Sequence, residues 1–246
     1  FANFFLLLIS ICKTIAESNI QLSEYTDRFS IYFSEFITNN SFNPNFFSNH
    51  FEIVTKSFDC LSDLLSKTNS NENKSKILSF FNLFQKNLLS EFAPIQKFSA
   101  HCLSKLCQNP KNGQIIMENA DRNLGSILES IVTNDIHGDA LKELQPFIQF
   151  EIELGIINLK KLIQFWTVCR DSPNLNENPV IINLFAFALK YLDDDSIREF
   201  LSAIQIELTP FYYNILAKTI SELQNFERTI EISIVNARLL LNLAIV

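Results

Sequence analysis

The stretch that decides the fold runs from Asn176 to Leu223 and reads NENPVIINLFAFALKYLDDDSIREFLSAIQIELTPFYYNILAKTISEL. Its first segment, Pro179 to Leu192, repeats apolar residues at intervals of three and four, which places them on one face of a helix. Asp193 to Asp195 then supply an N-cap and the negative charge that favours a helix start. Thr209 and Pro210 have the residue types of a third N-cap and first helical position. The stretch therefore predicts three amphipathic helices joined by short links, as is typical of a helical repeat array.

The apolar faces of these three predicted helices need neighbours to pack against. A chain of 246 residues is ordinary for a stacked array, in which each helical layer packs only against the layers beside it. The faces consist of Ile181, Leu184, Phe185, Ala188, Leu189 and Leu192 in the first helix, of Ile197, Phe200, Leu201 and Ile204 in the second, and of Tyr212, Ile215, Leu216, Ile220 and Leu223 in the third.

The composition favours helices over strands. Hydrophobic residues make up 47% of the chain, which is too apolar for a disordered protein. Glycine occurs only four times, and the hairpin dipeptide Asn-Gly occurs only at Asn112-Gly113, so the turns that a β fold needs are missing. No shift in composition marks a second domain. We therefore predict an all-α fold that forms one continuous region over residues 1–246.

Charge and cysteine usage limit the possible partners and compartments. A net charge of -7 argues against a phosphate-binding surface, so we predict no nucleic-acid partner. Cysteines scattered over apolar helix faces are typical of reduced, buried thiols, which favours the cytoplasm or the nucleus. The five cysteines are Cys12, Cys60, Cys102, Cys107 and Cys169.

The two ends of the chain are apolar. The run from Phe1 to Ile11 has no Lys or Arg before it and is too short to span a bilayer, so we interpret it as a first helix that ends near Glu17, with a cleaved signal peptide as the alternative. We predict no membrane partner. Because the chain lacks an initial Met and ends within the apolar run from Leu243 to Val246, we expect it to be an excerpt of a longer protein.

Further helices are predicted between the first helix and Pro94. Two polar stretches, Thr38 to Asn45 and Asn69 to Ser75, are rich in Asn and Ser and are predicted to be loops. The apolar faces of the helices around them consist of Phe4, Leu7, Leu8, Ile11 and Ile15; of Tyr25, Phe29, Tyr32, Phe33 and Phe36; of Val54, Phe58, Leu61 and Leu65; and of Ile77, Phe81, Phe84 and Leu88.

From Pro94 the pattern changes to a long helix, a short helix and a long helix. Pro94 is predicted to open the first, Asn109 and Pro110 to end it, and Asp121 to cap the third. The sequence here resembles an armadillo repeat in three segments: Asn109-Pro110-Lys111-Asn112, Ile115-Ile116 and Leu124-Gly125-x-x-Leu128. The resemblance implies an armadillo/HEAT-like right-handed α-solenoid of stacked helix pairs and triplets. The long helices carry Ile95, Phe98, Cys102, Leu103 and Leu106, and Leu124, Ile127, Leu128, Ile131 and Val132.

The next two helices are predicted on either side of Gly155. Gly138 and Asp139 start a helix that Pro146 is expected to kink or interrupt, because proline removes a backbone donor. Gly155 ends this helix, and Asn158 opens the next. The two apolar faces consist of Leu141, Leu144 and Ile148, and of Leu159, Leu162, Ile163 and Trp166.

His101, Cys102 and Cys107 form the densest cluster of potential metal ligands. Cys102 and Cys107 lie about 140° apart around a helix, so they do not converge, and no second Cys or His pair completes a tetrahedral site. A cysteine nucleophile would need an oriented histidine beside it, and neither His50, His101 nor His137 stands in a recognisable catalytic signature. We interpret the cluster as packed thiols and a histidine at the edge of a helix face.

Other polar residues also have structural explanations. Asp193 to Asp195 with Glu199 could bind a divalent cation, but the spacing of a calcium loop is absent and helix capping explains them. No glycine-rich phosphate loop occurs. The basic pairs Lys160-Lys161 and Lys74 with Lys76 are interpreted as solvated faces. Trp166 is interpreted as a core residue because it extends an apolar face, with an exposed binding anchor as the alternative.

Between Leu154 and Leu243 the chain contains, in this order, the segments Ile156–Trp166, Val180–Leu184, Tyr191–Leu192, Ser196–Leu201, Glu207–Tyr212 with Ile215–Leu216, and Leu239–Leu243. This order is similar to that of the helical region that precedes the catalytic domain in the largest ubiquitin-specific proteases, the fat-facets type. The resemblance implies that the parent chain is a thiol-dependent deubiquitinase and that this segment is its non-catalytic scaffold. Neither the Asn and Cys box nor the His box of that family occurs here, so we assign no catalytic, cofactor-binding or metal residue.

These observations leave three hypotheses for function. The first is an α-solenoid scaffold within a large ubiquitin-specific protease, with other proteins, such as ubiquitinated substrates or ubiquitin-pathway factors, as partners. The second is a stand-alone armadillo or HEAT adaptor in transport or signalling. The third, an enzyme acting within these residues, would require loss of turnover when Cys102 or Cys169 is replaced by serine.

Overall fold

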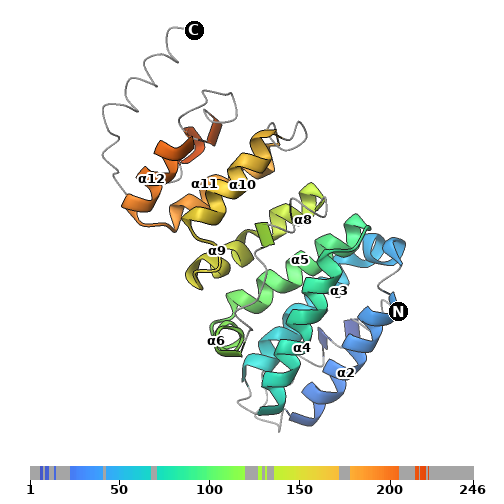
Figure 1. Cartoon of the computed structure of the whole chain (residues 1–246). Coiled ribbons are helices and arrows are strands. Elements are labelled where there is room, and N and C mark those ends of the chain that lie inside the picture. Colours follow the sequence, from blue (N-terminus) through green and yellow to red (C-terminus); the bar gives the residue numbers. More distant parts are fainter. Residues whose placement is uncertain are drawn as a thin grey trace. The chain divides into compact units, whose positions relative to one another are not determined.

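A computed structural model of the chain describes residues 23–40, 43–67, 71–119, 136–171 and 178–204, with a few helical residues within 6–14, 127–131 and 214–221. These residues contain helices and no strand, so the all-α prediction is confirmed (Figure 1). The helices are α2 (Ser23–Asn40), α3 (Pro44–Lys67), α4 (Asn71–Leu88), α5 (Ala93–Gln108), α6 (Pro110–Asn119), α8 (Gly138–Glu143), α9 (Gln145–Glu153), α10 (Leu159–Asp171), α11 (Pro179–Lys190) and α12 (Asp194–Ile204).

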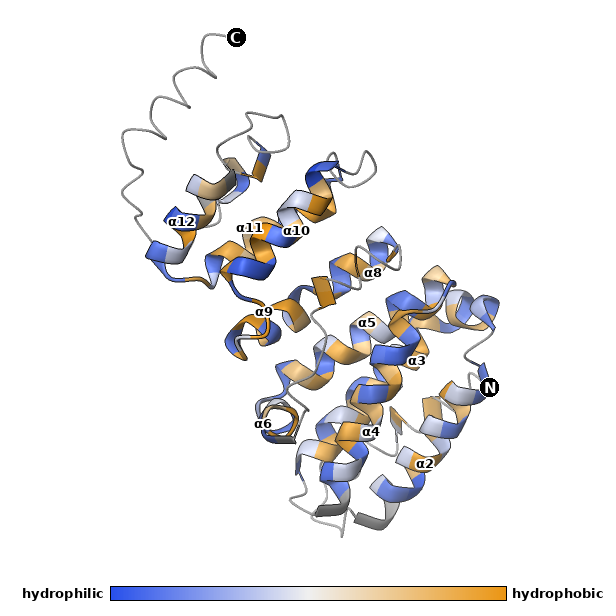
Figure 2. Ribbon diagram, viewed as in Figure 1, coloured by the Kyte–Doolittle hydropathy of each residue, from blue (hydrophilic) through white to orange (hydrophobic). Residues whose placement is uncertain are grey.

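The chain divides into two compact units, residues 1–171 and residues 172–246. The first unit contains α2 to α10, and the second contains α11 and α12. Hydrophobic residues line the faces along which helices of one unit pack against each other, whereas polar residues cover the outer faces (Figure 2). The prediction of one continuous helical region stays a prediction.

Aromatic side chains fill the core between α2, α3 and α4. Phe58 of α3 is completely buried, and its ring centroid lies 5.6 Å from that of Phe33 on α2. The rings of Phe80 and Phe84 on α4 lie 5.7 and 4.8 Å from Phe58 in edge-to-face geometry. These rings join the three helices into one core because each helix contributes to the same cluster.

Helices α3, α5 and α8 run side by side in the same direction (Figure 1). Phe47 near the start of α3 contacts Phe98 near the start of α5, and Asp63 near the end of α3 contacts Lys105 near the end of α5, so the two helices are parallel. Between α3 and α5, helix α4 runs the opposite way, since the Asn73 side chain near its start donates to the Leu65 carbonyl near the end of α3. The direction of the chain therefore alternates from α3 to α5.

The junction between α5 and α6 is compact. Asn109 ends α5, and its side chain accepts a hydrogen bond from the backbone N–H of Lys111 at 3.2 Å in the first turn of α6. The buried Asn112 donates to the Ser62 carbonyl and hydroxyl oxygens of α3, both at 3.1 Å. Gly113, predicted only as part of a hairpin dipeptide, lies inside α6 against the backbone of Cys107.

The predicted order of long, short and long helix is confirmed for its first two members. Pro94 lies in the first turn of α5, and α6 is the short helix. Of the third helix, Ile127, Leu128 and Ile131 are described; all three are helical and buried. Asp121, the predicted cap, lies outside the described residues, as do Leu124 and Val132.

Pro146 interrupts the helix from Gly138 as predicted. It lies in the first turn of α9, directly after the break at Leu144 that separates α8 from α9. Gly155 ends α9 with a φ of +70°, a conformation that glycine adopts without steric cost. Asn158 then caps α10 by accepting a hydrogen bond from the Lys161 N–H at 3.1 Å.

Both loop predictions before Pro94 were too long. Residues 38–40 continue α2, and α3 already begins at Pro44, because proline suits the first helical position and Asn43 accepts from the Phe46 N–H. Likewise, α4 begins at Asn71, within the predicted loop from Asn69 to Ser75. Polar composition misled the prediction here, since Asn and Ser are preferred not only in loops but also at helix N-caps.

Among the described residues, two members of the predicted apolar faces are exposed. Tyr32 of α2 is 58% exposed, whereas Phe29 and Phe33 on the same helix are buried. Leu7 is also 58% exposed. Cys12 and most of the first predicted helix lie outside the described residues. The described part of α2 therefore has a narrower buried face than spacing alone predicts.

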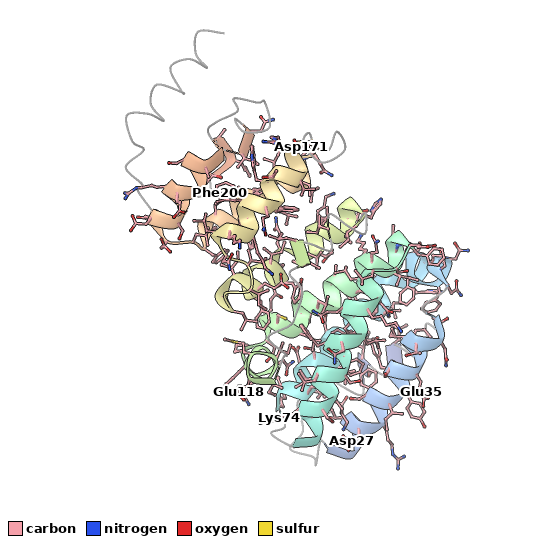
Figure 3. The ribbon with its side chains drawn as sticks, viewed as in Figure 1. Asp27, Glu35, Lys74, Glu118, Asp171 and Phe200 are labelled. Atoms are coloured by element: carbon pink, nitrogen blue, oxygen red, sulfur yellow. The ribbon has the colours of Figure 1, made fainter. Side chains whose placement is uncertain are left out.

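In the second unit, side-chain caps start α11 and α12, and of these the cap of α12 was predicted. Asn178 accepts from the Val180 N–H at 2.9 Å to cap α11, and Asp193 accepts from the Ser196 N–H at 2.8 Å and the Ser196 hydroxyl at 2.9 Å to cap α12. Phe200, which Figure 3 labels, lies with its ring 6.1 Å from Phe185. Thr209 and Pro210 lie outside the described residues.

Candidate functional site

The most distinctive polar cluster lies where α3, α5 and α8 meet. His101 of α5 is hydrogen-bonded on both ring nitrogens: Nε2 lies 3.0 Å from Asp59 Oδ1 of α3, and Nδ1 lies 3.2 Å from Glu143 Oε2 of α8. Both ring nitrogens carry protons only in the imidazolium, so this geometry fits a positively charged ring between two carboxylates. The cluster thus links three parallel helices by charge.

Three opposing influences set the pKa of His101. Partial burial lowers it, whereas the hydrogen bonds and negative charges of Asp59 and then of Glu143 raise it. The two carboxylates outweigh burial, so the pKa of His101 is raised above its ordinary value of 6.5. The ring therefore stays protonated to a higher pH than a free histidine does.

The same face of α5 carries a basic residue one turn to either side of His101. On the C-terminal side, Lys105 pairs with Asp63 of α3 at 3.2 Å. On the N-terminal side, the ammonium of Lys97 lies 4.6 Å from the ring centroid of Phe51 on α3. We call Lys97, His101 and Lys105 the basic row of α5. Its last two members face carboxylates of α3, and its first faces an aromatic ring.

A pocket of about 320 Å³ opens beside Lys97, where the first turns of α5 and α8 meet the N-terminal half of α3. His50 has non-helical backbone angles and kinks α3 at this level. His137 caps α8 through the Asp139 N–H at 3.3 Å, and the Gln96 side-chain oxygen accepts from the His137 N–H at 2.8 Å. The pocket walls include Phe47, Phe51, Pro94, Lys97, His137 and Asp139.

His101 cannot activate the neighbouring Cys102 as a nucleophile. Both His101 nitrogens face carboxylates, so neither is left to accept a proton from a thiol. Burial raises the pKa of Cys102 and of Cys107 well above the ordinary value, with smaller contributions from nearby carboxylates. Burial also raises the pKa of Cys169 to about 12. These three thiols stay protonated near neutral pH, and a protonated thiol is a poor nucleophile.

The described residues hold no group of three or more His, Cys, Asp and Glu side chains placed for a metal ion. The acidic cluster before α12 is used locally. Asp193 caps the helix, and the hydrogen bonds from Ser196 lower the pKa of Asp193 below its ordinary value. Asp195 forms an ion pair with Arg198 at 3.3 Å, and Glu199 is exposed. The predicted capping role is therefore confirmed for Asp193.

Each of the two basic pairs has one exposed lysine, whereas Lys76 and Lys161 are partly buried. Lys74 and Lys160 are exposed, as predicted. Lys76, however, is partly buried and forms an ion pair with Asp27 of α2, so its prediction as a solvated residue was wrong. Figure 3 shows Asp27 and Lys74 at the same end of α2 and α4. Trp166 is 4% exposed, which confirms its prediction as a core residue.

A buried glutamate also escaped the sequence analysis. Glu151 of α9 is 1% exposed, and its two carboxylate oxygens lie 3.2 and 3.1 Å from the backbone nitrogen of Ile127. The carboxylate thus serves as an acceptor for a helical backbone N–H. The sequence Phe150-Glu151-Ile152-Glu153 gives no sign that the first glutamate is buried and the second exposed.

Replacing His101 with glutamine is expected to make stability less dependent on pH. Because folding raises the pKa of His101, its charge contributes stability that is complete below pH 6.5 and is lost as pH rises through the folded-state pKa. The wild-type chain should therefore exceed the variant in free energy of unfolding by about 1–2 kcal/mol in mild acid and by less in mild alkali. Denaturant titrations over this pH range measure the difference.

The matched control for this prediction is Lys105→Gln, which removes the next ion pair on α5. Histidine is the side chain whose charge usually changes between pH 5 and 8, so a variant that keeps His101 should lose the same stability throughout this range. If the free energy of unfolding changed with pH in the same way for the wild-type chain and His101→Gln, His101 would not be charged between its two carboxylates.

None of the described helices is both long and apolar enough to cross a lipid bilayer. Comparisons of the chain with family models, with curated proteins and with solved structures found no match. Function must therefore be argued from the chain itself.

Proposed function

We propose that this chain is a non-catalytic α-solenoid scaffold that binds other proteins. The observation that carries the proposal is a constant sequence separation between residues that meet on neighbouring helices. Asp59 of α3 contacts His101 of α5, and His101 contacts Glu143 of α8; in both cases the partners are 42 positions apart in the sequence. Armadillo and HEAT repeats have a period of about 40–47 residues. Equivalent positions of consecutive repeats meet in such an array, as these three residues do.

The helix directions support the same interpretation. In a solenoid, alternate helices run parallel and each repeat packs only against its neighbours. Helices α3, α5 and α8 are parallel, and α4 runs against α3. The capped α5–α6 junction at Asn109 and Asn112 supports an armadillo-like triplet within this array. A right-handed stack with a protein-binding face follows from this proposal.

Solution scattering tests the array. A compact globule of 246 residues has a radius of gyration of about 18 Å, and a solenoid of the same length is more extended. We expect a radius of gyration clearly above this value for the intact chain, together with an elongated distance distribution. A compact particle would contradict the solenoid and, with it, the extended binding surface.

We further propose that the parent protein is a large ubiquitin-specific protease of the fat-facets type, acting in the cytoplasm or nucleus on ubiquitinated substrates. The ordered similarity from Leu154 to Leu243 supports this proposal. The full-length protein should then form a covalent adduct with a ubiquitin probe that bears a reactive C-terminus. The adduct should persist when Cys102 and Cys169 are replaced by serine, because the attacking thiol lies outside residues 1–246.

The second candidate is a stand-alone armadillo or HEAT adaptor. The α5–α6 junction favours it, because the sequence there, Asn109-Pro110-Lys111-Asn112 with Ile115-Ile116, is the segment that resembles an armadillo repeat. A full-length protein that gives an extended particle but no adduct with the ubiquitin probe would support the adaptor and exclude the protease.

A further inference from the structure

The pocket beside Lys97 combines an aromatic wall with a positive charge. Phe47 is completely buried at its base, and Phe51 is partly exposed beneath the Lys97 ammonium. Pro94 adds a rigid apolar surface from the first turn of α5. The volume of about 320 Å³ is at the lower end of the range for ligand pockets, about 300–1,000 Å³. It therefore suits one anchoring side chain.

Lys97 is the one member of the basic row of α5 that lacks a carboxylate partner among the described residues. His101 and Lys105 pair with Asp59 and Asp63 of α3, whereas Lys97 meets the ring of Phe51. The Lys97 side chain is also partly buried, which weakens the hydration of its charge. An incoming carboxylate would complete the row by providing the partner that α3 does not.

The other polar groups of the pocket leave this positive charge in place. Asp139 pairs with Lys142 at 3.3 Å, so a neighbouring charge offsets its carboxylate. His137 Nδ1 accepts the Asp139 N–H, which leaves the proton of a neutral ring on Nε2 as a possible donor. The net charge of -7 for the chain does not oppose an acidic ligand here, because charges beyond about 8 Å are largely screened at physiological salt.

We propose that this pocket binds an acidic segment of a partner protein. An aromatic or long aliphatic side chain of the segment packs against Phe51 and Pro94, and an adjacent Asp or Glu pairs with Lys97. The inference rests on the proposed protein-binding function and specifies the partner's chemistry. The apolar wall distinguishes this ligand from a free anion, which would gain nothing from Phe51 and Pro94.

Selection of short random peptides displayed on phage against the intact chain tests the inference. Enriched peptides should carry an aromatic or long aliphatic residue next to Asp or Glu. A synthetic copy of an enriched peptide, labelled with a fluorophore, should bind the wild-type chain and lose about tenfold or more in affinity with Lys97→Glu. Selection on Lys97→Glu should instead enrich peptides with Lys or Arg beside the apolar residue.

Two further variants separate charge from folding. Lys97→Met keeps the aliphatic stem and removes the charge, so it should weaken the acidic peptide without creating a preference for basic ones. Lys111→Glu is the matched control, since Lys111 is exposed on α6 and does not line the pocket. It makes the same change in net charge and should leave affinity unchanged. Unfolding curves of all variants confirm that each is folded.

Three results would overturn the inference. One is enrichment of peptides without acidic residues, and another is an equal loss of affinity with Lys111→Glu. The third is a peptide that behaves as a simple anion. Inorganic phosphate would then displace it at the concentration at which phosphate itself binds, and replacing the peptide's apolar residue would not change its affinity. None of these results would contradict the scaffold proposal, because solution scattering and the ubiquitin probe test that proposal independently of this pocket.

Discussion

Replacing Phe58 with alanine is expected to lower the free energy of unfolding of the first unit by about 3–5 kcal/mol. Phe58 is completely buried, and the rings of Phe33, Phe80 and Phe84 lie within 5.7 Å of its centroid. Alanine would leave a cavity between α2, α3 and α4. The cavity cannot close easily, because Phe33 also packs on Phe29 and Phe84 on Phe98. Denaturant unfolding followed by circular dichroism measures the loss.

Tyr32→Ala is the control for Phe58→Ala. Tyr32 also belongs to an aromatic face predicted from the sequence, but it is 58% exposed. Its replacement should change the free energy of unfolding by no more than about 0.5 kcal/mol, as is usual for surface positions. Equal losses for the two variants would mean that the cluster around Phe58 is not the core of this unit.

The contrast between these two residues shows how far helical periodicity predicts the core. Every residue of the predicted face of α3, Val54, Phe58, Leu61 and Leu65, is buried. On α2 the same spacing also included Tyr32, which lies at the flank of the buried face. Periodicity gives the direction of a face but not its width, because the width depends on how closely the neighbouring helices approach.

The polar cluster around His101 could not be predicted in the same way. Asp59 and Glu143 are each 42 residues from His101, and both resemble ordinary solvent-facing residues of their helices. Only the register between stacked helices brings the three together. A repeat period found in the sequence could have revealed the pairing, but the charged residues themselves do not repeat: an acid, a base and an acid occupy the three equivalent positions.

Helix ends were predicted well where one residue type determines the end. Pro146, Gly155, Asn158 and Asp193 all act as predicted, because each has a backbone or capping property that few other residues share. The stretch from Asn71 to Ser75 was predicted as loop from composition alone and is helical. Asn73 within it is buried and bonded to Leu65, a long-range contact that the sequence does not show.

Gly113→Ala is expected to destabilise the first unit, although alanine favours an ordinary helix interior by about 1 kcal/mol over glycine. An ideal Cβ at Gly113 would lie 2.9 Å from the carbonyl oxygen of Cys107 and 3.5 Å from the ring of Phe150. The oxygen belongs to the backbone of α5 and cannot rotate away. Helix α6 would therefore have to move off α5, at a cost of about 1–3 kcal/mol from overpacking that should outweigh the gain in propensity.

Gly138→Ala in α8 is the matched substitution, because a Cβ there meets no atom within 4 Å. It should be neutral or stabilise the unit by about 0.4–1 kcal/mol, by reducing the freedom of the unfolded chain. The informative quantity is the sign of the change in free energy of unfolding, measured for both variants under one set of conditions. If Gly113→Ala also stabilised the unit, α6 would not lie against the end of α5 closely enough to form an armadillo-like junction. The packing argument for the helical triplet would then fail, whereas the contacts among α3, α5 and α8 would be unaffected.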